Sequence, residues 1–135
     1  MATQTYVNLP VKDLDRTTEF FTRLGFKFDP RFSNEKAACM VVSDDSFVML
    51  LTEDFFRGFT KKQITDPTTH TEVIIALSAE TREAVDRLVD TALANGGTPS
   101  NEPMEMDGMY ERSFQDPDGH LWEVLHMDPF AVPSP

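Results

Sequence analysis

The stretch YVNLPVKDLDRTTEFFTRLGF, residues 6–26, contains the signals of a strand followed by a helix. Its first six residues alternate and are rich in strand-forming side chains, which predicts a strand over residues 6–11. Asp13 can cap the first helical turn with its carboxylate, and Gly25 readily adopts the left-handed conformation that ends a helix. We therefore expect a helix between these two residues.

Three short strands are expected after this helix. The runs that indicate them are residues 26–28, 37–42 and 47–52. The polar residues 43–46 predict a turn between the last two strands. The first half of the chain therefore has the expected order strand, helix and three strands.

The second half repeats this order, beginning with EVIIALSAETREAVDRLVDTALANGG, residues 72–97. A strand is expected over residues 72–78, and apolar residues then recur at helical spacing up to the glycines. They are Val85, Leu88, Val89, Ala92 and Leu93. Further strands are expected around Thr98, at 109–114 and at 121–125, with a turn between the last two.

The repeat predicts an α+β fold built from two βαβββ modules. We expect one domain over residues 1–135 with four parts. These are a first module at 5–53, a connecting segment at 54–70, a second module at 71–127 and a tail at 128–135. Two such modules can curl the sheet faces that their helices leave uncovered into a shared ligand cleft.

Charge and cysteine content limit the environment and the partners. The formal net charge is −11 at pH 7, and no basic stripe offsets it, so nucleic acid and anionic membranes are not expected partners. Cys39 is the only cysteine, so no disulfide can form within the chain. We expect a cytoplasmic location.

Two motifs resemble the glyoxalase/bleomycin-resistance/extradiol-dioxygenase superfamily, also called the vicinal-oxygen-chelate superfamily. The first combines LPVKDL at residues 9–14, the aromatic pair Phe20-Phe21 and LGF at 24–26; the second is DPDGHLWE at 116–123. Within the superfamily the chain looks most like bacterial proteins described as predicted lactoylglutathione lyases. The resemblance implies a curved mixed sheet whose two modules share a small-molecule cleft.

The resemblance also implies positions for a divalent metal, held by one residue from each of four strands. These positions fall at Tyr6, Leu50, Ile74 and Glu123. Leu50 and Ile74 have no donor atom, and Tyr6 is a poor ligand for a hard dication. We therefore expect a cleft without metal and without any other cofactor.

Glu123 is the candidate catalytic residue. It lies between Trp122 and Val124 in a predicted strand, so its side chain faces the cleft if theirs face a helix. There it can serve as a general base or as an anchor for a cationic or hydrogen-bonding ligand. The alternative is a structural glutamate held by Tyr6 or Arg112.

Further residues are candidates for the cleft wall. They are Tyr6, Asn8, Leu50, Glu72, Ile74 and Arg112. A metal site displaced to His70, Glu72 and Glu123 is an alternative that no known family pattern supports. Met104, Met106 and Met109 lie in a loop-like stretch, where flexible thioethers can line a pocket mouth or simply face solvent.

Three classes of function remain open at this point. The first is metal-free binding of a small molecule, or acid–base catalysis, in the cleft. The second is a metal-dependent isomerase resembling lactoylglutathione lyase, and the third is a non-catalytic interaction protein. The resemblance implies a homodimer, and Phe55, Phe56 and Phe59 are candidate interface residues. The alternative is a monomer in which these rings close one end of the cleft.

Overall fold

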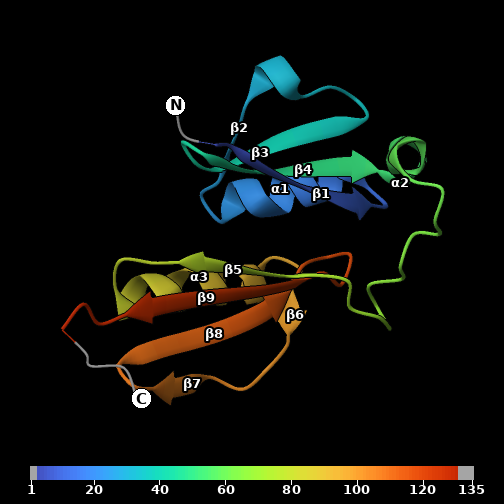
Figure 1. Cartoon of the computed structure of the whole chain (residues 1–135). Helices are drawn as coiled ribbons and strands as arrows, with labels where there is room; N and C mark the ends of the chain where they lie inside the picture. The colour runs from blue at the N-terminus through green and yellow to red at the C-terminus, as the bar shows by residue number, and fades with distance from the viewer. Residues whose placement is uncertain (1–2, 131–135) are drawn as a thin grey trace. The chain divides into compact units, whose positions relative to one another are not determined.

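The computed structural model describes residues 3–130 and has an α+β fold (Figure 1). The chain divides into two compact units, residues 1–65 and 66–135. Each unit contains a mixed sheet with one long helix packed against it, which confirms the predicted class and the two modules; the second module has one more short strand than the predicted βαβββ order, over residues 104–106. Within the described residues, no helix is both long enough and apolar enough to cross a membrane.

The first unit places its strands in the order β1-β4-β3-β2, with β1 and β4 parallel and the other neighbours antiparallel. Its elements are β1 (Thr5–Val11), α1 (Leu14–Arg23), β2 (Lys27–Phe28), η1 (Pro30–Phe32), β3 (Ala37–Ser43), β4 (Ser46–Thr52), α2 (Glu53–Phe56) and η2 (Arg57–Phe59). The two 3-10 turns and the short helix α2 were not predicted.

The helix signals of the first unit act as expected. The Asp13 carboxylate accepts a hydrogen bond from the Arg16 backbone N–H at 3.0 Å, and Gly25 has a φ of 102°. Phe20 and Phe21 on α1 are buried, and their rings meet edge to face with centroids 4.9 Å apart. The core of this unit therefore lies between α1 and its sheet.

The second unit has the strand order β5-β9-β8-β6, and β7 also pairs with β8. Its elements are β5 (Ile74–Ser78), α3 (Arg82–Ala94), β6 (Thr98–Pro99), β7 (Met104–Met106), β8 (Met109–Gln115) and β9 (Leu121–Met127). The helix begins after Thr81, whose hydroxyl accepts from the Ala84 backbone N–H at 3.0 Å. Val85 and Val89, on the apolar side of α3, are buried.

Strand β7 differs from the prediction of a loop. It pairs antiparallel with β8 through a two-residue turn in which Asp107 and Gly108 have φ values of 52° and 81°. Positive φ at both central residues is typical of a type I′ hairpin turn. The strand has only three residues, all exposed, which is too short for the alternation of apolar and polar residues to identify it. The predicted tail extends beyond Phe130 into residues that lie outside the described part of the chain.

Candidate functional site

The sheet of the second unit has one face covered by α3 and one that α3 leaves uncovered, which we call the open face. Trp122 and Val124 on β9 are fully buried, and α3 contacts β9 and β8. Because side chains alternate along a strand, Glu123 between them points to the open face. The register places further side chains there, namely Ile74, Ala76, Glu111, Ser113, Leu121 and Leu125.

Glu111 and Glu123 form a pair of carboxyl groups on the open face. Glu123 lies directly opposite Ser113, and Glu111 directly opposite Leu125, so the two glutamates are diagonal neighbours. Burial raises the pKa of Glu111, and its hydrogen bond to Glu123 and the charge of Glu123 raise it further. The arrangement keeps Glu111 protonated to a higher pH than an isolated, exposed glutamate. Such a pair can accept a proton or bind a cationic group.

The sequence reasoning missed Glu111, although a usable signal was present. The register of the β8–β9 hairpin places Gln115 opposite Leu121. Counting back from this pair puts Glu111 on the same face as Glu123, because side chains alternate along both strands.

Arg112, a candidate for the cleft wall, does not lie on the face of Glu123, so the alternative in which it holds this glutamate does not apply. It pairs with Val124 across the sheet and points toward α3. Its Nη1 donates to Asp86 Oδ1 at 3.0 Å and to Asp90 Oδ1 at 2.9 Å. The same Asp86 oxygen accepts from the Tyr110 hydroxyl at 2.5 Å. Arg112 on β8 therefore links this strand to α3 through ion pairs with Asp86 and Asp90.

Leu50 also differs from its predicted position. It pairs with Leu9, has none of its surface exposed and lies on the α1 side of the first sheet. Met49 is the residue of β4 that shares a face with Asn8, since these two are cross-strand partners. Leu50 is therefore a core residue of the first unit and not part of a cleft wall.

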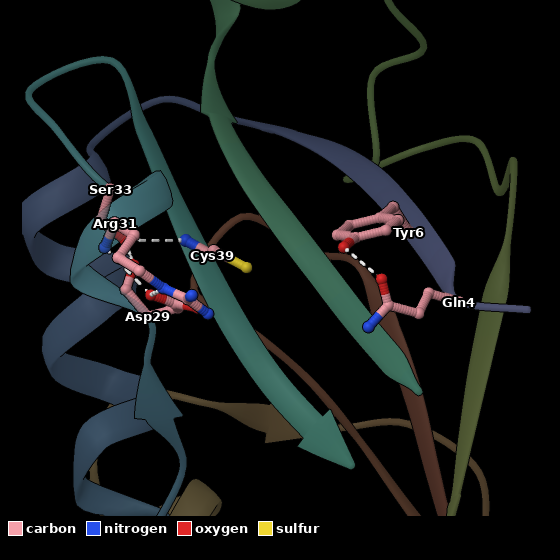
Figure 2. Close-up of polar contacts among 6 residues, drawn as sticks. All are labelled: Gln4, Tyr6, Asp29, Arg31, Ser33 and Cys39. Atoms are coloured by element: carbon pink, nitrogen blue, oxygen red, sulfur yellow. Dashed lines mark hydrogen bonds and ion pairs between the residues drawn. The ribbon is translucent and has the colours of Figure 1, made fainter. Parts of the chain in front are cut away.

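Tyr6 and Asn8 lie on the face of the first sheet that α1 leaves uncovered, and both are exposed. The Tyr6 ring stacks on Phe47 with centroids 4.9 Å apart and planes at 14°. Its hydroxyl donates to Gln4 Oε1 at 3.2 Å (Figure 2). Tyr6 therefore has partners within its own unit, and neither of them is a glutamate.

Cys39 lies on the same face, opposite Met49. Its backbone N–H donates to Ser33 Oγ at 3.1 Å, which joins η1 to β3, and Asp29 and Arg31 form an ion pair of 2.8 Å beside it (Figure 2). Burial raises the pKa of the Cys39 thiol. A buried thiol with a raised pKa is a poor nucleophile.

The residues at the implied metal positions do not fit a divalent ion. Leu50 and Ile74 offer only carbon atoms; Ile74 lies on the open face opposite Leu121 and is 50% exposed. Glu72 is exposed just before β5, and His70 Nδ1 lies 2.8 Å from Thr69 Oγ1. Among residues 3–130, no group of three or more His, Cys, Asp or Glu side chains is placed to hold a metal.

The first unit also contains a hollow of about 530 Å³ beside η2. Its lining residues are Lys36, Thr52, Asp54, Phe55, Gly58 and Phe59. The Phe55 and Phe59 rings meet edge to face with centroids 5.2 Å apart, and Phe59 is 64% exposed. An exposed ring of this size is compatible with an interface. Dimerisation through these phenylalanines stays a prediction.

Comparison with known proteins agrees with the motifs. The family model described as "Glyoxalase/Bleomycin resistance protein/Dioxygenase superfamily" matches residues 3–124. A hypothetical protein from S. aureus is 30% identical, with 93% of this chain and 94% of that chain covered and a TM-score of 0.78. A search of curated proteins finds no significant match.

Two further solved structures share the fold at lower identity. A glyoxalase/bleomycin resistance protein/dioxygenase family enzyme from Burkholderia phytofirmans is 19% identical, with 94% and 100% of the two chains covered and a TM-score of 0.77. The fosfomycin resistance protein FosX from Listeria monocytogenes, solved with Mn(II) and sulfate, is 20% identical, with 96% and 93% covered and a TM-score of 0.68.

Proposed function

Because the chain belongs to the glyoxalase/bleomycin resistance protein/dioxygenase superfamily, we propose that it binds a small molecule without a metal, on the open face of the second sheet. The anchor is the carboxyl pair Glu111–Glu123, and the ligand presents an ammonium or another cationic hydrogen-bond donor to it. The observation that carries this proposal is the raised pKa of Glu111 beside a second glutamate on a face that α3 leaves uncovered.

Electrostatics favour a cation at this pair. Two carboxylates on diagonal positions repel each other when both are ionised, and a cation between them relieves this repulsion. Leu121, Leu125 and Ile74 surround the pair with hydrocarbon. The formal charge of −11 attracts cations to the protein as a whole. An organic cation with an apolar body therefore matches the surface.

Binding of such a cation is expected to strengthen as the pH rises. The pKa of Glu111 is raised in the folded protein, so Glu111 loses its proton at a higher pH than an exposed glutamate does. Cation binding then gains the second negative charge. Titration calorimetry with phenethylammonium between pH 4.5 and 8 should show an affinity increase of roughly tenfold.

Variants that each remove one negative charge distinguish binding at the carboxyl pair from attraction by the net charge of the protein. Glu111→Gln and Glu123→Gln should each weaken phenethylammonium binding several-fold and flatten its pH dependence. Glu83→Gln, in the first turn of α3, removes one charge elsewhere in the same unit and should leave both unchanged. Equal weakening by all three variants would mean that the probe senses only net charge.

The same calorimetry with added metal ions or chelators tests whether the carboxyl pair binds the ligand without a metal. Addition of Ni²⁺, Zn²⁺ or Mn²⁺ should not be needed for binding, and chelators should not reduce it. A strict metal requirement would contradict the proposal. Chelator-resistant turnover of the methylglyoxal–glutathione adduct that disappears in Glu123→Gln would instead show an isomerase that uses the pair as a base.

A further inference from the structure

Four methionines gather at one end of the second sheet, on the open face. Met106, Met109 and Met127 lie directly opposite one another on β7, β8 and β9, and we call these three the methionine row. Met104 is two residues from Met106 on the same side of β7, opposite Glu111. All four side chains therefore project from the same face.

Backbone hydrogen bonds fix the spacing of the row. Met106 and Met109 flank the two-residue turn at Asp107-Gly108, which sets their register. The Asp128 N–H donates to the Gly108 carbonyl at 3.0 Å, and this bond flanks the pair Met109–Met127. The pair is thus of the non-hydrogen-bonded type, in which Cα atoms approach to about 4.5 Å. Neighbouring strands lie about 4.8 Å apart, so the long, flexible side chains of the row are able to converge above Met109.

The row faces outward instead of filling the core. Met106 is 56% exposed and Met127 50%, Met109 between them is half-buried, and Met104 beside the row is 38% exposed, whereas Met40 in the first unit is fully buried. Methionine normally fills core space with its flexible side chain. Several exposed thioethers in cross-strand register therefore need an explanation other than packing within the unit.

We propose that the methionine row binds a soft monovalent cation, Cu(I) or its analogue Ag(I). Thioether sulfur is a neutral, polarisable donor, and soft ligands of this kind select Cu(I) over hard dications. No donor has to lose a proton, because a thioether has none to lose. Asp107 and Asp128 beside the row add negative charge next to the cation. The site differs in residues and chemistry from the Glu111–Glu123 pair.

Methyl NMR tests this proposal with internal controls. In protein carrying ¹³C-methyl methionine, Ag(I) should shift the resonances of Met104, Met106, Met109 and Met127 and reach saturation near one equivalent. Met40 and Met49, both in the first unit, should not move. Shifts confined to Met40 and Met49 would place the ion at Cys39 instead and overturn the proposal, as would the absence of saturation at ten equivalents.

Substitutions distinguish Cu(I) binding by the methionine row from Cu(I) binding by the Cys39 thiol. Met106→Leu with Met127→Leu preserves side-chain volume and should weaken Cu(I) binding at least tenfold in competition with a chromogenic chelator. Met49→Leu is the matched control and should leave the affinity unchanged. The measurement is repeated in Cys39→Ala, where the tenfold difference should persist. Loss of all binding in Cys39→Ala would contradict the proposal.

Discussion

Replacement of Asp116 by alanine is expected to destabilise the protein by roughly 3–5 kcal/mol, a large part of the total for a domain of this size. The Asp116 carboxylate is buried and accepts four hydrogen bonds. Oδ1 accepts from the backbone N–H groups of Asp118, Gly119 and His120 at 3.0, 3.1 and 3.0 Å. Oδ2 accepts from Trp122 Nε1 at 3.0 Å. Alanine leaves these donors without their acceptor.

Thermal and urea denaturation measure this effect, and two variants test its cause. Asp116→Asn retains one carbonyl oxygen for the backbone donors but turns an amide toward the indole N–H, so it should cost about 1–2 kcal/mol. Asp44→Ala changes an exposed residue in the β3–β4 turn of the first unit and should stay within about 0.5 kcal/mol. A small effect of Asp116→Ala would mean that water replaces the carboxylate.

The sequence predicted the repeated order of elements because the helix caps and the turns are local signals. Asp13 and Gly25 act at the ends of α1 as expected. The DPDG stretch was predicted as the turn before the last strand, and it occupies that place between β8 and β9. The four donors gathered by Asp116 were not predicted, because they become apparent only once the turn is folded.

The candidate site was harder to predict, because a residue belongs to it only if its side chain lies on the correct face of the strand. Residues 47–51 of β4 are all apolar, so no alternation indicated that Leu50 faces α1 while Met49 faces the other way. Register with β1 supplies this information, and register is a tertiary feature. Arg112 and Glu111 are adjacent on β8, and the hairpin register assigns them to opposite faces. Counting residues across the β8–β9 turn would have placed Glu111 in the predicted site instead of Arg112.

Replacement of Gly119 by alanine is expected to cost roughly 3 kcal/mol and to lower the melting temperature by about 10 °C. Gly119 has a φ of 100°, a conformation that side chains with a Cβ rarely adopt. An added Cβ would also lie 2.9 Å from the Pro67 carbonyl oxygen and 3.1 Å from its carbon. Backbone strain and a contact with main-chain atoms therefore act together, and no flexible side chain can move aside.

Gly58→Ala provides the matched control for this prediction. An added Cβ at Gly58 meets no atom within 4 Å, so the substitution should change stability by less than about 0.5 kcal/mol. Equal costs at both glycines would show that the contact with Pro67 and the positive φ do not set the cost, because the unfolded-chain entropy lost on Gly→Ala stabilises the folded state. Because Gly119 donates to Asp116 in the same turn, the double variant with Asp116→Ala should cost less than the two single changes together. Glu123 lies four residues after Gly119 on the strand that follows this turn. If the turn sets the register of the carboxyl pair, Gly119→Ala should also weaken phenethylammonium binding.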